Sequence, residues 1–169
     1  MKSLSVCKFA AVALLALSLP ALAVTSSSFK YSNPKTGFLS ISPMALAPDS
    51  DNSAIDYTIG WNSTLDGNGC YNTGVNLPQG SKILEVSYYQ AGRVDANLTS
   101  NEVATGTQGN LASIANPPLA ASRTLVTFTL PTPVVVRNDT KNYGFGVCLQ
   151  SGEHFFGARI KYSYANAGD

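Results

Sequence analysis

The chain has 169 residues, carries a formal charge of +1 and has charged side chains at only 12% of its positions. No block of like charge stands out along the sequence, which argues against electrostatic capture of nucleic acid or of an anionic membrane. Ser, Thr, Asn and Gly are abundant, so the composition argues against a helical bundle and favours an exported β protein with many turns.

Residues 1–23 have the pattern of a signal peptide. Lys2 and Lys8 flank the start of the apolar run Phe9–Leu19, and Ala21-Leu22-Ala23 resembles a cleavage site. The run is shorter than the roughly 20 residues that span a bilayer, which disfavours a membrane anchor or a buried helix. We expect a secreted protein, extracellular or periplasmic, with one domain over residues 24–169 and no membrane span. Cleavage leaves nine Lys and Arg (11 minus two) against ten Asp and Glu, a net charge of about −1.

Short strands are predicted through the first half of this domain. Two weak strands are expected at residues 29–31 and 38–41, and residues 44–48 are expected to form a loop or an edge segment. Residues 54–61 alternate strongly and predict a strand, with an inner face of Ile55, Tyr57, Ile59 and Trp61. The sequence Asp66-Gly67-Asn68-Gly69 predicts a turn.

The segment Leu77–Tyr89 is the clearest strand prediction in the chain. Pro78 and Gly80 are typical of a turn, and polar and apolar residues alternate after it. We expect an inner face of Leu84, Val86 and Tyr88. Glu85 is expected on the outer, polar face.

The second half of the chain predicts four further strands. Residues 94–98 place Val94, Ala96 and Leu98 on one face, whereas the polar residues 99–109 are expected outside the core. The other three strands have inward faces predicted by alternation: Val126, Phe128 and Leu130 in residues 123–130; Tyr143, Phe145, Val147 and Leu149 in residues 143–150; and Phe156, Ala158, Ile160, Tyr162 and Tyr164 in residues 155–164.

About eight to ten short strands with turns between them predict an all-β protein, an antiparallel β-sandwich of jelly-roll-like type. An immunoglobulin-like sandwich is the alternative, but Trp61 precedes both cysteines of the domain instead of lying between them. Cys70 and Cys148 are expected to form a disulfide, because an exported chain with two cysteines favours a bridge. Cys148 shares its predicted strand face with Gly144 and Gly146, so we expect the segment around Cys70 to cross over that face.

Three segments carry a resemblance to known proteins. The turn and strand at residues 77–89, the Pro-Val-Val pattern at residues 133–143 and Gly-Ala-Arg-Ile-Lys-Tyr at residues 157–162 resemble exported bacterial β-sandwich proteins of unknown function. The resemblance implies a small secreted jelly roll. It implies no catalytic residue.

Candidate metal ligands are sparse. Asp49, Asp51, Asn52 and Asp56 are hard oxygen ligands of the kind that bind Ca²⁺, although a loop of Asx turns is the alternative reading and the EF-hand pattern is not met. His154 is the single histidine, and one histidine with two bridged cysteines cannot supply an ordinary zinc site. No other cofactor is expected.

Aromatic residues supply the candidate ligand-binding positions. Tyr57, Trp61 and Tyr88 fall on predicted inner faces, which leaves Tyr71 and Tyr89 for a surface that could stack on a sugar ring. We therefore expect a non-catalytic secreted β-sandwich, a surface or carbohydrate-binding module whose partner is an extracellular glycan or protein. The alternatives are an assembly protein that pairs through strand edges, and a small glycan-active enzyme using Asp56 and Glu85.

Overall fold

The computed structural model describes residues 29–49, 54–58 and 64–167, so the predicted signal peptide lies outside the described residues. These residues form ten β-strands and one short 3-10 helix: β1 Phe29–Ile41, η1 Pro43–Ala45, β2 Ala47–Pro48, β3 Ala54–Thr58, β4 Thr64–Val75, β5 Lys82–Gly92, β6 Asp95–Glu102, β7 Gln108–Ile114, β8 Ala120–Val135, β9 Lys141–Leu149 and β10 His154–Ala167.

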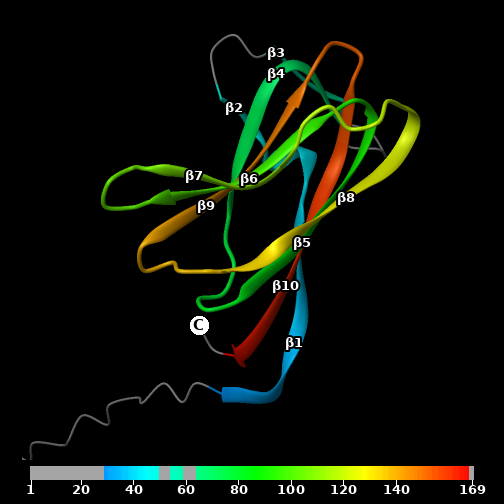
Figure 1. The fold of residues 1–169 in the computed structure, drawn as a ribbon. Coiled ribbons are helices and arrows are strands. Elements are labelled where there is room, and N and C mark those ends of the chain that lie inside the picture. Colours follow the sequence, from blue (N-terminus) through cyan, green and yellow to red (C-terminus); the bar gives the residue numbers. More distant parts are fainter. Residues whose placement is uncertain (1–28, 50–53, 59–63, 168–169) are drawn as a thin grey trace, which may run out of the picture.

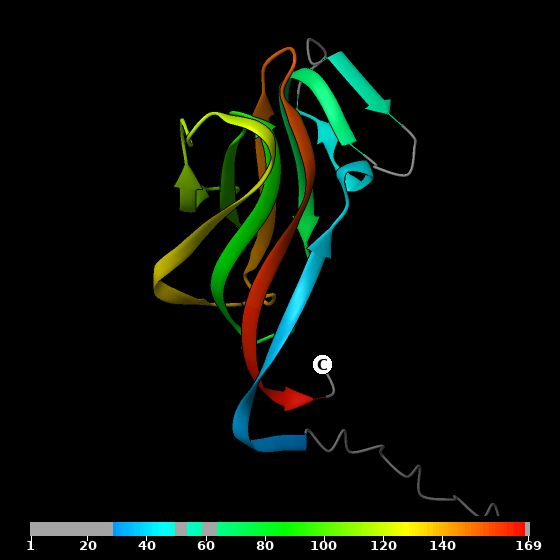
Figure 2. The same ribbon diagram turned by 90° about the vertical axis from the view of Figure 1, so that its right-hand side faces the viewer.

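The strands form two layers in which every pair is antiparallel (Figures 1 and 2). The four main strands of one layer, here called sheet A, follow the order β1-β10-β5-β8. The other layer, sheet B, follows the order β2-β4-β9-β6-β7. The prediction of an antiparallel β-sandwich is confirmed.

Aromatic side chains fill the space between the sheets. The ring of Phe155 in sheet A lies 6.1 Å from that of Phe145 in sheet B and 6.4 Å from that of Tyr88, measured between centroids. Burial of such rings is a main source of stability in a domain of this size. Further fully buried apolar side chains come from both sheets and the adjoining loops: Tyr71, Ile83, Val86, Val94, Leu98, Val136 and Ile160.

Strand β4 belongs to both layers, and this makes the turn predicted at residues 66–69 wrong. Its first part pairs with β3 and with β10, where Asp66 lies opposite His154. Its second part pairs with β9 in sheet B, starting at Gly69 opposite Leu149. Gly69 has φ 139°, a conformation that a glycine adopts readily. The glycines therefore bend a continuous strand from one sheet to the other instead of reversing the chain.

Strand β5 lies between β10 and β8, and the predicted turn before it is confirmed. Gly80 has φ 75°, and the Ser81 N–H donates to the Pro78 carbonyl over 3.1 Å. The inner face differs by one residue at its start, because the pairing with β8 shifts between Ile83 and Glu85. That bulge turns Ile83 into the core and leaves Leu84 only half-buried, so the prediction for Leu84 was wrong.

A second bulge reverses the start of β10. The pairing with β5 shifts between Phe155 and Gly157, and Gly157 has φ 123°. Phe155 is consequently fully buried, while Phe156, which alternation had placed in the core, is half-buried on the outer side. Ala158 and Ile160 are buried as predicted.

Strand β9 and the start of β6 follow their predicted faces, whereas the side chains of the inner face predicted for residues 54–61 lie outside the described residues. All four predicted inner residues of β9 are buried, as are Val94, Ala96 and Leu98 around the start of β6. The prediction that residues 99–109 lie outside the core was wrong for the first of them. Strand β6 continues to Glu102, and Ser100 is buried. At the edge of sheet A, β8 accommodates Pro131 and Pro133, since an edge strand has no partner for the missing N–H.

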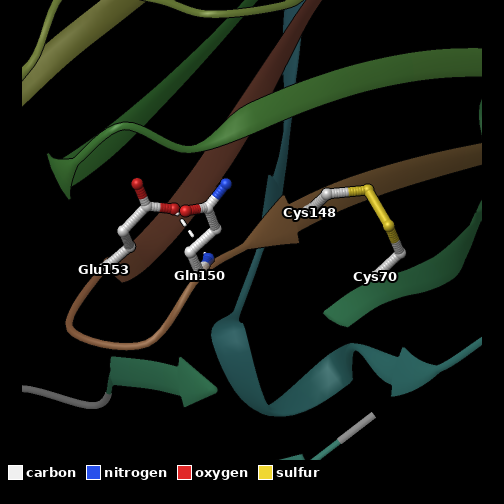
Figure 3. Close-up of a disulfide and its surroundings, with 4 residues drawn as sticks. All are labelled: Cys70, Cys148, Gln150 and Glu153. Atoms are coloured by element: carbon white, nitrogen blue, oxygen red, sulfur yellow. Dashed lines mark hydrogen bonds between the residues drawn. A yellow bond between two sulfur atoms is a disulfide. The ribbon is translucent and has the colours of Figure 1, made fainter. Parts of the chain in front are cut away.

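Cys70 and Cys148 form a disulfide within sheet B (Figure 3). The two residues lie opposite each other on β4 and β9, with 4.0 Å between their Cα atoms. The Cys70 segment therefore runs beside β9 and does not cross over it, contrary to the prediction. Side chains of the neighbouring β6 cover the glycines of that face: a Cβ on Gly146 would lie 2.5 Å from Oδ1 of Asn97. Next to the bridge, the Gln150 N–H donates to Oε2 of Glu153 over 2.7 Å.

Candidate functional site

The outer face of sheet A exposes large apolar side chains of the kind that are normally buried in a domain core. Phe38 of β1 is 52% exposed, Tyr89 of β5 is 43% exposed and Leu125 of β8 is 48% exposed. Phe156 of β10 is half-buried beside them. We call this surface the aromatic face, and it comprises Phe38, Ser40, Ser87, Tyr89, Arg123, Leu125, Phe156 and Arg159.

Strand register explains how residues distant in sequence meet on this face. Gly157, Tyr89 and Leu125 lie in one cross-strand row, and Ser40, Arg159 and Ser87 lie in the next. The bulge at Gly157 places Phe156 outward beside the first row. A Cβ at Gly157 would lie 3.1 Å from the Ile41 carbonyl oxygen, so the close approach of the two strands requires a glycine here.

These rows enclose a shallow groove of about 300 Å³ on the aromatic face. Its volume is at the lower end of the range for small-molecule sites. The Ser40 side chain is exposed at the rim, whereas the Ser87 hydroxyl donates to the Arg159 carbonyl over 3.5 Å. The groove is lined by Ser40, Ile41, Ser87, Tyr89, Leu125, Phe156, Gly157, Ala158 and Arg159.

Two arginines lie over the aromatic rings. The guanidinium carbon of Arg123 is 5.0 Å from the ring centroid of Tyr89 and 4.9 Å from that of Phe156. The guanidinium carbon of Arg159 is 4.7 Å from the ring centroid of Phe38. A planar guanidinium over a ring gains cation–π attraction and still has N–H groups to donate. The face therefore combines rings with charged hydrogen-bond donors.

Directly behind the aromatic face, Tyr88 points the other way from β5 into the core. Its hydroxyl donates to the Val94 carbonyl over 2.7 Å. Burial raises the pKa of the Tyr88 phenol above its ordinary value, and the charge of Asp95 adds to the effect. Tyr88 is therefore a neutral structural residue, and Tyr89 is the tyrosine of this strand that reaches the surface.

The outer face of sheet B carries a second groove, of about 440 Å³, with different chemistry. Gly144 and Gly146 of β9 form its floor, and side chains from β4 and β6 form its walls. We call it the amide trough. Its outward-facing side chains are predominantly amides and hydroxyls, with one carboxylate: Asp49, Asn72, Asn97, Thr99, Asn101 and Gln108.

The two tyrosines predicted for ligand binding differ in how far their side chains are exposed. Tyr89 is exposed and lies at the centre of the aromatic face. Tyr71 is only 1% exposed, because β4 turns it into the core between the sheets. The prediction for Tyr71 as a surface aromatic was therefore wrong. The sequence analysis assigned no strand face to Tyr71, since the residues before it were taken for a turn instead of part of a continuous strand.

Most of the side chains predicted as Ca²⁺ ligands lie outside the described residues. Asp51 and Asn52 lie outside the described residues, and so does the side chain of Asp56, whose backbone belongs to β3. Asp49 is exposed, and its N–H donates to the Cys70 carbonyl over 3.0 Å. Across the described residues, no group of three or more His, Cys, Asp or Glu side chains gathers as a metal site would. Nδ1 of His154 pairs with Oδ1 of Asp66, which gives the single histidine a structural partner.

The structure separates the two carboxylates considered for glycoside hydrolysis. Asp56 lies opposite Asp66, which in turn lies opposite His154 at the start of β10. Glu85 lies opposite Lys161, seven residues further along the same strand. At about 3.3 Å per residue this is roughly 23 Å. Paired catalytic carboxylates lie about 5–10 Å apart, and the backbone positions of residues 56 and 85 are further apart than such a pair requires.

Phe38, Phe156 and the two arginines were missed as site residues from the sequence. Phe156 was assigned to the core because alternation does not reveal a bulge. Phe38 lay on a weak strand of unassigned orientation. The arginines gave no signal, since Arg123 and Arg159 lie more than 30 residues apart in the sequence and their strands come together only through their pairing with β5.

Comparison with known proteins identifies no family. No protein-family model and no curated protein matches the sequence. Solved structures with a similar arrangement include the C-terminal family 6 carbohydrate-binding module of a marine laminarinase from Zobellia galactanivorans, at 20% identity and TM-score 0.45, covering 73% of this chain and 98% of that one. A carbohydrate-binding module of Cellvibrio mixtus lichenase 5A, in complex with cellotriose, has 14% identity and TM-score 0.44 over 78% and 98%.

A structure of infectious bursal disease virus is also similar, with 8% identity and TM-score 0.36 over 79% of this chain and 32% of that one. Likenesses this remote do not identify a shared function, which must be inferred from the side chains. The resemblance to exported bacterial proteins stays a prediction. Within the described ranges, no helix has the length and hydropathy needed to cross a bilayer.

Proposed function

We propose that the protein is an exported, non-catalytic glycan-binding domain whose ligand lies on the aromatic face. The observation that carries this proposal is the groove bordered by Tyr89 and Phe156, because two aromatic side chains from neighbouring strands remain at a surface instead of in the core. The apolar face of a pyranose ring can pack on such rings, while polar groups at the rim bind its hydroxyls.

The polar groups needed for a sugar are present around the rings. The exposed Ser40 hydroxyl can donate or accept, and Arg123 and Arg159 supply N–H donors. A flat strand-borne surface of this kind suits a polysaccharide chain better than a small enclosed ligand. Export to the extracellular space or periplasm would place the domain where such chains occur.

The proposal is tested by binding to an array of neutral and acidic oligosaccharides, followed by calorimetric titration of the best ligand. Tyr89→Ala removes the central exposed ring, and we expect affinity to fall about fivefold or more, since an aromatic contact contributes about 1 kcal/mol or more. Asn97→Ala in the amide trough is the matched control and should bind as the wild type does.

Two results would contradict the proposal. Absence of binding to every oligosaccharide would remove glycan recognition as the function. If Asn97→Ala lost binding while Tyr89→Ala bound as the wild type does, the site would lie in the amide trough.

Assembly through strand edges receives less support from the structure. The edge strand β8 carries Pro131, Pro133 and Arg123, and prolines and charges on an edge disfavour pairing with another strand. The opposite edge of sheet A, β1, carries Lys30, Pro34 and Lys35, and the edge strand β7 of sheet B is short, at seven residues. Light scattering over a range of concentrations would detect assembly, for which we expect a constant monomeric mass.

A further inference from the structure

The strands of sheet A concentrate positive charge that the linear sequence disperses. Within β1, β5, β8 and β10, whose backbones are described throughout, Glu85 is the single acidic residue. The same four strands contain six basic residues: Lys30, Lys35, Lys82, Arg123, Arg159 and Lys161. A surface with this balance attracts anions over several ångströms. Folding therefore gathers positive charge on one sheet, although the sequence contains no block of like charge.

The two arginines of the aromatic face are available for a charged ligand. Among the described residues, neither Arg123 nor Arg159 forms an ion pair with a carboxylate. Their cation–π contacts with Tyr89, Phe156 and Phe38 hold the guanidinium groups beside the groove. Arginine binds carboxylates through two parallel N–H groups, which makes it selective for planar anions.

We propose that the aromatic face selects acidic glycans, with uronic acid units whose carboxylates bind Arg123 and Arg159 while a sugar ring packs against Tyr89 and Phe156. This inference rests on the proposed glycan-binding function and adds the class of sugar. The rings favour a sugar over an anion that lacks an apolar face. The unpaired guanidinium groups favour a carboxylate-bearing sugar over a neutral one, because a neutral ligand would leave their charge uncompensated.

The test compares tetragalacturonate with its methyl ester, which keeps the sugar and removes the charge. We expect the wild-type chain to bind the acid at least tenfold more tightly at low salt, and the preference to shrink as sodium chloride is raised, because salt screens exposed charges. The double variant Arg123→Ala/Arg159→Ala should bind acid and ester with similar affinity. Thermal melting checks that each variant is folded.

A matched control removes two positive charges from elsewhere. Arg93 lies between β5 and β6, and Lys141 begins β9, where it pairs with Glu102 over 2.9 Å. Arg93→Ala/Lys141→Ala lowers the net charge by the same amount and should keep the preference for the acid. If both double variants lose the preference equally, general charge is responsible and the assignment to the two arginines is overturned.

The remaining outcomes separate this inference from the proposed function. Equal binding of acid and ester by the wild type would overturn the inference and leave glycan binding intact. Binding of dextran sulfate or a single-stranded oligonucleotide as tightly as tetragalacturonate would also overturn it, since the surface would then be a general anion binder. Failure to bind acid, ester and every neutral sugar would overturn the glycan-binding function itself.

Discussion

The two outer faces of the sandwich are built from the same kind of strand pairing and present opposite chemistry. The aromatic face on sheet A combines exposed rings with Arg123 and Arg159. The amide trough on sheet B has a glycine floor and walls dominated by amides and hydroxyls, and none of the described residues that line it is basic. The difference shows that a nearly neutral chain can carry one cationic surface, because folding sorts the charges by sheet.

The sorting follows from which strands become neighbours. The strands β2, β6, β7 and β9 of sheet B contain Asp95, Glu102 and Lys141, so their balance is slightly acidic. Lys141 is already paired with Glu102. The cations of sheet A lack such partners among the described ion pairs. The aromatic face should therefore discriminate by charge, and the amide trough should not.

Removing the disulfide should produce the largest change, and it acts on the side of the amide trough. The bridge closes a loop with a sequence separation of 78 residues. The chain-entropy model gives a loss of about 4 kcal/mol for Cys70→Ala/Cys148→Ala, measured as the free energy of unfolding in urea. Reduction of the wild type should give the same loss. A change below about 1 kcal/mol would mean that the bridge does not constrain the unfolded chain.

A glycine from each face provides a matched pair of substitutions. Gly157→Ala forces a side chain to φ 123° and against the Ile41 carbonyl, so we expect a loss of about 1–3 kcal/mol in the free energy of unfolding. Gly74→Ala beside the trough meets no atom within 4 Å and should be neutral or slightly stabilising. Thermal and urea unfolding measure both. Equal effects would show that the bulge at Gly157 is not required.

The adjacent tyrosines of β5 separate stability from binding. Tyr88→Phe removes a buried hydrogen bond and should cost about 1 kcal/mol without changing glycan affinity. Because the folded chain raises the pKa of Tyr88 above 10.0, the unfolded chain ionises first, and this residue's contribution to stability is lost as the pH rises above about 10. The variant should therefore lose less stability than the wild type between pH 9.5 and 11.5. If Tyr88→Phe and the wild type lost the same stability over this pH range, ionisation of Tyr88 would not be the cause of the loss.

The smallest effect is expected for the exposed ion pair of sheet B. Lys141→Ala breaks the 2.9 Å contact with Glu102, and both side chains are partly exposed, at 33% and 41%. Exposed pairs of this kind contribute about 0–1 kcal/mol, so the free energy of unfolding should change by less than about 1 kcal/mol. Binding to the aromatic face should be unchanged. A loss of acidic-glycan affinity would show that charge on the far sheet matters.

The sequence predicted the strands that alternate without interruption and failed where a bulge intervened. The inner residues of β9 and the start of β6 were correct because the pairing of β9 with β4 and with β6 keeps one register throughout. Leu84 and Phe156 were wrong because one extra residue reverses the side chains before the bulge relative to those after it. The pairing of Cys70 with Cys148 was predicted because the chain was expected to be exported. The position of the two cysteines on neighbouring strands of one sheet was not predicted.

The candidate site was predicted only at Tyr89. Apart from Ser87, its other members come from three further strands, whose order in the sheet cannot be inferred from composition or alternation. The bend of β4 was hidden for a related reason: Asp-Gly-Asn-Gly is a strong turn sequence when read locally, and only its pairing partners on both sides show that the strand continues.

The bend in β4 has a consequence for how the molecule comes apart. Because β4 forms backbone hydrogen bonds in both layers, the layers cannot separate unless β4 loses its hydrogen bonds to one of them. Amide protons on either side of Gly69 should then exchange with deuterium through a single global opening event, with the same protection. The domain would behave as one cooperative unit in which neither layer melts before the other.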